Sequence, residues 1–360
     1  MTQMRRTPEL TTLCYLEDGD RYLMLHRVKK KNDVNHDRWI GVGGHIEFGE
    51  SPEECILRET KEETGLSLTS FRLRGAVTFV SDRGDFEYMF LFTADGFTGT
   101  PHACSEGELE WLPKEKVFSL NLWEGDRIFF RLLAENAPFF SLKLHYDEKD
   151  TLREAVLNGK ALELFDILNE DGTKSGIVRE RGVAHRDGSL HQTVHLWIAR
   201  KKADGTFDLL LQKRSEDKDC YPGCWDISSA GHVPAGETRE QAVLRELSEE
   251  LGVVPEDPSE IRDAGPFRIA FDDVFHGQPF CDREIAELCV WIHDLDLEGL
   301  PIQREELTEV RWFPFSRCLQ MAKDRSLLPN CLVYDELLRV EEALAESSQA
   351  ASTRQPESGR

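Results

Sequence analysis

One pattern occurs twice in this chain of 360 residues, and it constrains the fold more than any other feature. The stretch GHIEFGESPEECILRETKEETGL occupies residues 44–66, and GHVPAGETREQAVLRELSEELGV occupies residues 231–253. The offset between the copies, 231 − 44 = 187 residues, is too long for a solenoid repeat and suits two separate domains. We therefore predict domains at residues 1–157 and 162–345, followed by a small, polar and disordered tail at 346–360.

Each copy carries the signals of a helix set among strands. Ser51 with Glu54, and Thr238 with Gln241, have capping-box spacing, and a glycine suits the end of each helix. In the first half, periodicity and turn residues predict strands at 11–16, 21–25, 72–81, 86–94, 108–112 and 140–146, and a helix at 124–133. In the second half they predict strands at 163–168, 192–199, 207–211 and 287–292, and a helix at 334–345. This mixture indicates the α/β class.

The charge balance and the cysteines limit the partners and the compartment. A formal net charge of −23 disfavours binding to long nucleic acid or to an anionic membrane surface, although a cation could carry in a small anionic substrate. No apolar stretch is long enough for a signal peptide or a membrane span. The nine cysteines lack zinc-ligand spacing and are typical of a reducing compartment. We expect a cytoplasmic protein, either a monomer or a homodimer.

Both predicted helices carry three glutamates at the spacing i, i+3 and i+4, which places them on one helix face. They are Glu59, Glu62 and Glu63 in the first copy, and Glu246, Glu249 and Glu250 in the second. Like charges at this spacing repel one another, and a bound cation would remove the repulsion. Clustered oxygen ligands on a rigid element suit Mg²⁺ or Mn²⁺. A solvated acidic helix would explain one such copy equally well, but two full copies make chance improbable.

Both stretches, written Gly-x5-Glu-x7-Arg-Glu-x2-Glu-Glu-x-Gly, resemble the Nudix box. The resemblance implies an α/β/α sandwich around a mixed sheet in each half, and hydrolysis of nucleoside diphosphates linked to another moiety. It implies metal binding by the six glutamates and by the carbonyl groups of Gly44 and Gly231. Arg58 and Arg245 would orient the carboxylates, while Glu50 and Glu237 would support the preceding loop. Thr60 replaces the usual aliphatic residue at a packing position.

The same resemblance implies a mechanism. Metal ions neutralise the diphosphate and lower the pKa of a bound water, and a glutamate accepts the proton of that water. Which glutamate acts as the base varies within the family and stays open here. The expected catalytic residues are Arg58, Glu59, Glu62, Arg245, Glu246 and Glu249.

The first half also resembles the bacterial 8-oxo-dGTP diphosphatases of MutT type, from about Thr11 to Tyr146, through DRWIGVGGHIEFGESPEECILRETKEETGL, GELEWLPKEKVFSLNLWEGDRIFF and PFFSLKLHYD. By position, Glu106 resembles an additional metal ligand. Trp123 and Asp126 fall where relatives stack on a purine and hydrogen-bond it, although Trp123 could instead be a core aromatic.

Two further features bear on the substrate of the first half. Arg27 and the lysines at 29–31 could hold phosphates, although the lysines suit a solvated loop equally well. Ile40 and Gly125 stand where the animal sanitising enzymes have Asn and Asp, which leaves the base selectivity open.

The second half contains LLLQKRSEDKDCYPGCWDISSAGHVPAGE, which resembles the Nudix branch that includes isopentenyl-diphosphate isomerase. Arg214 and Lys218 match basic residues that hold a diphosphate in that branch. The isomerase's metal ligands are matched by His185, His191, His232 and Glu287, although strand or loop polarity would also explain the histidines. The isomerases need a catalytic cysteine immediately before Gly-His, where this chain has Ala230.

The sequence therefore predicts a tandem Nudix hydrolase with Mg²⁺, or Mn²⁺, as cofactor. The first domain would cleave a nucleoside triphosphate such as 8-oxo-dGTP to the monophosphate and diphosphate. The second would hydrolyse an unidentified nucleoside or organic diphosphate. The alternatives are an isomerase in the second domain, which Ala230 disfavours, and a ligand-sensing role for one catalytically inactive domain.

Overall fold

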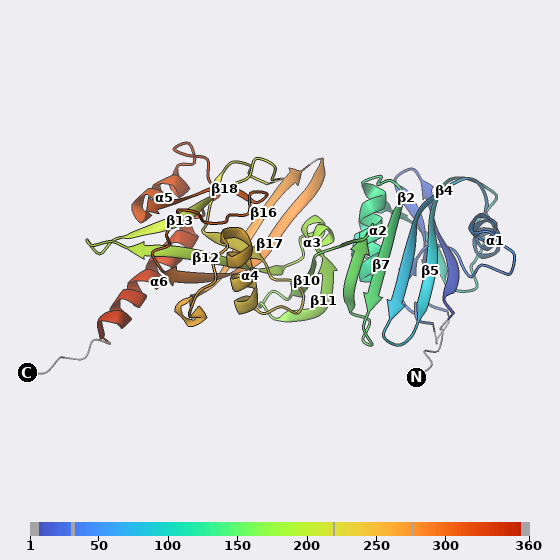
Figure 1. Cartoon of the computed structure of the whole chain (residues 1–360). Coiled ribbons are helices and arrows are strands. Elements are labelled where there is room, and N and C mark those ends of the chain that lie inside the picture. Colours follow the sequence, from blue (N-terminus) through green and yellow to red (C-terminus); the bar gives the residue numbers. More distant parts are fainter. Residues whose placement is uncertain (1–6, 30–32, 219, 276, 354–360) are drawn as a thin grey trace, which may run out of the picture. The chain divides into compact units, whose positions relative to one another are not determined.

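A computed structural model describes residues 7–29, 33–218, 220–275 and 277–353 (Figure 1). The chain divides into two compact units. The first comprises the chain up to Leu164 together with Gly176–Asp187, and the second comprises Phe165–Ser175 and the chain from Gly188 onward. The sequence predicted the domain boundary at residues 158–161. In the structure the chain passes to the second unit at Phe165–Ser175, returns to the first at Gly176–Asp187, and then stays in the second.

A sheet of mixed strand direction forms the centre of the first unit. Its order is β3-β2-β1-β5-β4-β7-β8-β9, with β6 paired to β2, and the β1–β5 and β4–β7 pairs are parallel. The strands are β1 (Glu9–Asp18), β2 (Arg21–His26), β3 (Trp39–Ile40), β4 (Ser67–Ser81), β5 (Phe86–Thr98), β6 (Glu108–Pro113), β7 (Phe140–Tyr146), β8 (Leu152–Leu157) and β9 (Lys160–Ala161). The helices are α1 (Pro52–Thr64) and α2 (Glu124–Ala134), with a 3₁₀ turn at Lys114–Ser119.

Different helices cover the two faces of this sheet (Figure 1). Side chains alternate along β1. Cys14 therefore belongs to a buried cluster with Ile56 of α1, whereas Tyr15 contacts Phe129 and Phe130 of α2. This arrangement is the α/β/α sandwich that the sequence predicted.

The second unit repeats the arrangement. Its sheet has the order β14-β13-β12-β17-β16, with β15 paired to β12 and β18 paired to β13, and the β12–β17 pair is parallel. The strands are β12 (His191–Lys201), β13 (Phe207–Arg214), β14 (Trp225–Asp226), β15 (Ser229–His232), β16 (Arg262–Phe275), β17 (Gln278–Ile292) and β18 (Leu307–Pro314). Three helices, α4 (Arg239–Leu251), α5 (Phe315–Lys323) and α6 (Tyr334–Thr353), accompany it, with a 3₁₀ turn at Pro258–Glu260.

Alternation along β12 again separates two cores. Leu196 packs in a cluster with Leu247 of α4, and Trp197 packs in a cluster with Leu337 of α6. Between β9 and β12 the chain forms a two-stranded sheet of β10 (Leu164–Leu168) and β11 (Lys174–Glu180), followed by the short helix α3 (Arg181–Asp187).

Several elements differ from the sequence prediction. The strands β8, β11, β16 and β18 and the helices α3 and α5 were not predicted. In β16, Gly265 and Pro266 argue against a strand, but β16 is the edge strand, where a missing backbone N–H is tolerated.

The helix α6 continues to Thr353, beyond the predicted end at Ala345, so the predicted tail at 346–360 is partly helical. No glycine or proline interrupts residues 346–353, and the Ser347 hydroxyl donates to the Ala343 carbonyl at 2.8 Å. Residues 354–360 lie outside the described residues.

Two further observations concern the described chain as a whole. All nine cysteines are free thiols. Within the described ranges, no helix is both long enough and apolar enough to cross a membrane.

Candidate active sites

The two box helices begin and end as the sequence predicted. Both capping boxes are present, with Ser51 and Glu54 on α1 and Thr238 and Gln241 on α4 bonded reciprocally. Gly65 (φ 78°) and Gly252 (φ 66°) end the helices in the left-handed conformation that favours glycine. These caps fix where each helix begins and ends.

On α1, Arg58 gathers the acids of the box. Its Nε donates to Glu50 Oε1 at 2.8 Å, its Nη1 to Glu59 Oε1 at 2.7 Å, and its Nη2 to the His45 carbonyl at 3.1 Å. Glu62 lies 3.5 Å from Nη1 and is largely exposed. The arginine thus ties the helix to the preceding loop and leaves Glu62 accessible.

On α4, Arg245 makes the same set of contacts. Its Nη2 donates to Glu237 Oε2 at 3.1 Å and to the His232 carbonyl at 3.0 Å. Its Nη1 donates to Glu246 Oε1 at 2.7 Å and to Glu249 Oε2 at 3.2 Å. The orienting and loop-supporting roles proposed for these residues are compatible with this geometry.

The last glutamate of each box is buried under the glycine loop. Gly43 N donates to Glu63 Oε2 at 2.9 Å, and Ala230 N donates to Glu250 Oε2 at 3.3 Å. Burial raises the pKa of Glu63 to about 7 and the pKa of Glu250 to about 8. The charge of Glu106 adds to the rise at Glu63.

Both loop glycines give a carboxylate room to approach the backbone. A Cβ on Gly44 would lie 2.5 Å from Glu59 Oε1, and a Cβ on Gly231 would overlap the carboxylate of Glu246. Each box therefore packs its first helix carboxylate against the loop glycine and bonds its last carboxylate to the loop backbone. This all-oxygen donor set fits a hard divalent cation such as Mg²⁺ or Mn²⁺.

In the first unit, Trp123 and Asp126 lie at the start of α2. Trp123 is mostly buried: its Nε1 donates to Asn35 Oδ1 at 2.8 Å, and the Arg38 guanidinium lies 3.7 Å from the ring centroid. Asp126 is 8% exposed, and burial raises its pKa to about 7. An acid and an indole thus lie together on the α2 side of the sheet.

The proposed phosphate-binding residues all have acidic neighbours. Arg27 Nε donates to Asp33 Oδ2 at 2.7 Å, and its Nη1 donates to Glu106. Arg214 Nη1 donates to Asp226 Oδ2 at 3.0 Å, and Lys218 donates to Glu306. A phosphate would therefore have to compete with these carboxylates. Of the lysines at 29–31, Lys30 and Lys31 lie outside the described residues.

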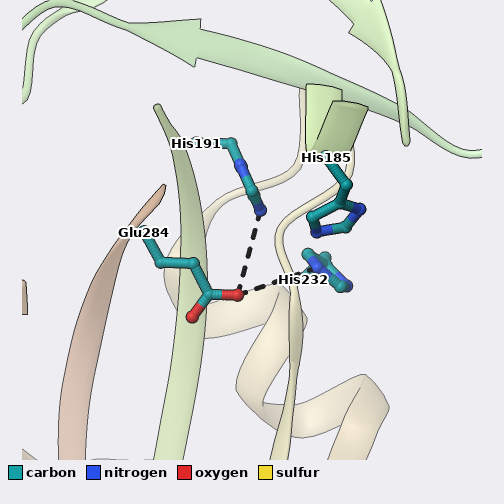
Figure 2. Close-up of side chains that lie close together, drawn as sticks. All are labelled: His185, His191, His232 and Glu284. Atoms are coloured by element: carbon teal, nitrogen blue, oxygen red, sulfur yellow. Dashed lines mark ion pairs between the residues drawn. The ribbon is translucent and has the colours of Figure 1, made fainter. Parts of the chain in front are cut away.

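Two histidines and a glutamate of the second unit come together near the start of β12 (Figure 2). One ligand atom each from His191, His232 and Glu284 lies within 4.8 Å of the others. His185, on α3, belongs to the first unit. His191 Nε2 and His232 Nε2 each lie 3.9 Å from Glu284 Oε1. The ring of Phe165 stacks on both histidines, at 4.7 Å from His191 and 4.6 Å from His232. We refer to His191, His232 and Glu284 as the histidine–glutamate group.

The donor set of this group differs from that of the boxes. Imidazole nitrogens with one carboxylate suit Zn²⁺ and related transition metals better than Mg²⁺. His191 is fully buried, and its Nδ1 lies 2.8 Å from the Ser189 carbonyl, so that Nε2 faces Glu284. A hydrogen bond from the other ring nitrogen is the usual way of orienting a metal-binding histidine.

The sequence predicted Glu287 as the carboxylate ligand, whereas Glu284 is the glutamate that lies beside His191 and His232. Residues three apart on a strand point to opposite faces. Glu287 accordingly accepts from Gln192 Nε2 at 3.1 Å and lies 3.5 Å from Arg239 of α4. Glu284 pairs with His191 in the parallel pair of β12 and β17, a register that the sequence alone does not give.

Comparison with known proteins agrees with the repeated pattern. The NUDIX domain family matches residues 7–133 and 189–331, which together make up most of the chain. The "Oxidized purine nucleoside triphosphate hydrolase" of Mus musculus is 30% identical over 148 residues, which are 41% of this chain and 92% of that protein. A MutT protein structure from Bacillus halodurans superposes with a TM-score of 0.38 at 28% identity, covering 42% of this chain and 97% of that one.

A longer relative is more similar in sequence. "Nudix hydrolase 3" of Arabidopsis thaliana is 42% identical over 158 residues, or 43% of this chain, and the match spans 20% of that protein's length. The two segments that match the family each contain a complete copy of the repeated glutamate pattern. The chain therefore belongs to the NUDIX family.

Proposed function

We propose that the chain is a divalent-metal-dependent pyrophosphohydrolase with one active site in each unit. The observation that carries the proposal is the repeated arrangement in which an arginine holds the box carboxylates beside a loop glycine. When bound there, a divalent cation would neutralise a diphosphate and acidify a water molecule. The names of the relatives, as Nudix hydrolases, support this reaction class.

The residues of each box have separable tasks in this proposal. In the first unit Glu59, Glu62 and Glu63, with the Gly44 carbonyl, would hold the cation, and in the second unit Glu246, Glu249, Glu250 and the Gly231 carbonyl would do so. Arg58 and Arg245 keep the first carboxylate of each box in place. The most exposed glutamates, Glu62 and Glu249, are best placed to accept a proton from water that reaches the site.

For the first unit we propose a purine nucleoside triphosphate, including 8-oxo-dGTP, as substrate, with the monophosphate and diphosphate as products. Trp123 and Asp126 supply an aromatic ring and an acid on the α2 side of the sheet. The name of the mouse relative supports an oxidised purine. Glu106, beside Glu63 and bonded to Arg27, is a further candidate ligand.

For the second unit we propose hydrolysis of a different organic diphosphate, with Arg214 and Lys218 near its phosphates. Ala230 supplies no thiol for the proton exchange that an isomerase needs. The histidine–glutamate group would hold a second cation of transition-metal type. The nine free thiols support a reducing cytosol as the compartment for both reactions.

The test is a substrate panel with Mg²⁺ on the full chain and on Glu62→Gln and Glu249→Gln variants. Glu62→Gln should lose the activities of the first unit and keep those of the second, and Glu249→Gln should do the reverse. Glu53→Gln and Glu240→Gln change exposed first-turn acids of the same helices and serve as matched controls. Full activity of both box variants on every substrate would refute the metal assignment. Equal rates on 8-oxo-dGTP and dGTP would refute the sanitising role of the first unit. Conversion of isopentenyl diphosphate to its allylic isomer, without release of phosphate, would favour an isomerase in the second unit.

A further inference from the structure

The second unit contains a buried histidine–carboxylate pair outside the box. His195 Nδ1 lies 2.9 Å from Glu336 Oε1, and Trp197 Nε1 donates to the same oxygen at 2.8 Å. Glu336 lies in the first turn of α6 and is 1% exposed. Two side chains from one face of β12 therefore fix a carboxylate that has almost no contact with water.

The pair leaves one imidazole nitrogen available. With Nδ1 committed to Glu336, the remaining nitrogen is Nε2, and among the described residues no hydrogen bond reaches it. The His195 side chain keeps 13% of its surface exposed. A buried acid that orients an imidazole in this way fixes the direction of the other ring nitrogen.

The position of His195 is next to both candidate metal sites of this unit. It pairs across strands with Ala230, the neighbour of Gly231 in the box loop. Thr193, on the same face of β12, donates to Glu284 Oε2 at 3.2 Å. Residues two apart on a strand are about 7 Å apart. A diphosphate held by a cation at the histidine–glutamate group could therefore reach the imidazole.

The surrounding charges favour the protonated form of His195. Burial by itself would lower its pKa, but the adjacent Glu336, with Glu284 on β17 and Asp226 on β14, raises the pKa to about 9. Asp226 is itself bonded to Arg214. At neutral pH, Nε2 thus carries a hydrogen and a share of positive charge.

We propose that His195 binds the substrate of the second unit, with its Nε2–H donating a hydrogen bond to a phosphoryl oxygen of the diphosphate, and that Glu336 is the residue that positions it. The inference rests on the proposed hydrolytic function of this unit. It distinguishes the two units, because the first unit has Leu13 at the equivalent strand position.

The test is calorimetric binding of Mg²⁺-imidodiphosphate, a diphosphate analogue that resists hydrolysis. All chains carry Glu59→Gln and Glu62→Gln, so that binding in the first unit is weakened equally. His195→Leu should raise the Kd about tenfold or more, because a hydrogen bond to a charged group is lost. His195→Gln keeps an N–H donor and should restore most of the affinity, and Glu336→Gln should lie between the two.

Three readouts separate this inference from a structural role and from the parent proposal. In ¹⁵N-histidine spectra of the otherwise unchanged chain, the Nε2 signal that His195→Gln removes should shift on addition of the probe, whether or not the leucine variant folds. An unshifted signal, or an unchanged Kd in a folded His195→Leu chain, overturns the inference. Unweakened binding in Glu249→Gln would instead overturn the proposed hydrolysis in this unit.

Discussion

The strands β1 and β12 occupy the same place in the two units, yet they carry different chemistry. Thr11 pairs with His45, and Thr193 pairs with His232, in the same antiparallel sense. Each threonine hydroxyl donates to a glutamate of the neighbouring parallel strand, Glu87 in the first unit and Glu284 in the second. The backbone frame is shared, so differences in function have to come from the side chains on it.

The first difference is the burial of the histidines. In the first unit His45 lies 3.2 Å from Glu9, with side chains 71% and 67% exposed. In the second unit His191 takes the position of Glu9 in the pairing and is fully buried. An exposed His–Glu pair contributes little, whereas buried imidazoles beside a carboxylate form a candidate metal site.

The second difference lies in the helix on the sheet face opposite to the box helix. Asp126 and Glu336 each lie in the first turn of that helix and are buried. The carboxylate of Asp126 accepts no hydrogen bond from the described side chains, whereas Glu336 binds His195 and Trp197. The same helix position therefore holds an acid that favours protonation in one unit and a charged pair in the other.

The largest predicted contrast concerns metal content. In excess Mg²⁺, which should occupy the boxes, the chain should bind about one further Zn²⁺ tightly. His232→Ala should abolish this binding, whereas His45→Ala, its counterpart in the first unit, should leave it unchanged. Equilibrium dialysis with elemental analysis measures both. Equal losses in the two variants would mean that the second unit has no special affinity for transition metals.

The next contrast concerns the two first-turn acids. Asp126 has a folded pKa of about 7, above its usual 3.8, so ionisation costs stability that is lost as pH rises from about 4 to 7. Asp126→Asn should therefore stabilise the first unit at pH 8, by up to about 4 kcal/mol, and change little at pH 4. Hydrogen exchange resolved to each unit measures the free energies of opening.

Glu336→Gln should act in the opposite direction in the second unit. The folded pKa of His195, about 9, exceeds its usual 6.5, so the pair's stabilisation is complete below pH 6.5 and is lost as pH rises through 9. The substitution should cost about 3 kcal/mol at pH 6, because it leaves a buried charge unpaired, and less at pH 10. If both variants shift stability in the same direction, the contrast between the two acids is wrong.

A smaller effect is expected from the box arginines, and here the units should behave alike. Arg58→Ala and Arg245→Ala each release the first box carboxylate from its loop. Each should lower kcat of its own unit about 100-fold, as expected for residues that orient metal ligands, and spare the other unit. The lysine variants, which keep one charge but not the fork, are the matched controls. If one of these variants lowers kcat in both units, the two reactions are coupled.

Much of this architecture could be predicted from local sequence signals. Capping boxes, terminal glycines and the i, i+3, i+4 glutamates depend on residues close together in the chain, and both box helices were predicted correctly. Contacts between distant segments could not be read in the same way. Glu336 lies 141 residues after His195, and nothing local in α6 indicates that its third residue binds β12.

Strand register and the edge position of a strand explain the other differences between the prediction and the structure. Glu287 was predicted from the resemblance alone, whereas Glu284 pairs with His191, and residues three apart on a strand lie on opposite faces. The strand β16 was missed because its glycine and proline argue against a strand unless its edge position is known. In both cases the missing information was the pairing partner, which local sequence does not contain.

The smallest predicted effect concerns the helix caps, which should be equivalent in the two units. Ser51→Ala and Thr238→Ala each remove one capping bond and should cost about 1 kcal/mol of helix stability. Aspartate at either position keeps a capping acceptor and should restore most of that loss. Hydrogen exchange across residues 52–64 and 239–251 measures the effect, and kcat should fall less than about twofold. If kcat falls by more than the loss of stability explains, the arginine contacts alone are too weak to hold the box glutamates in place. The caps would then also set the direction of these glutamates.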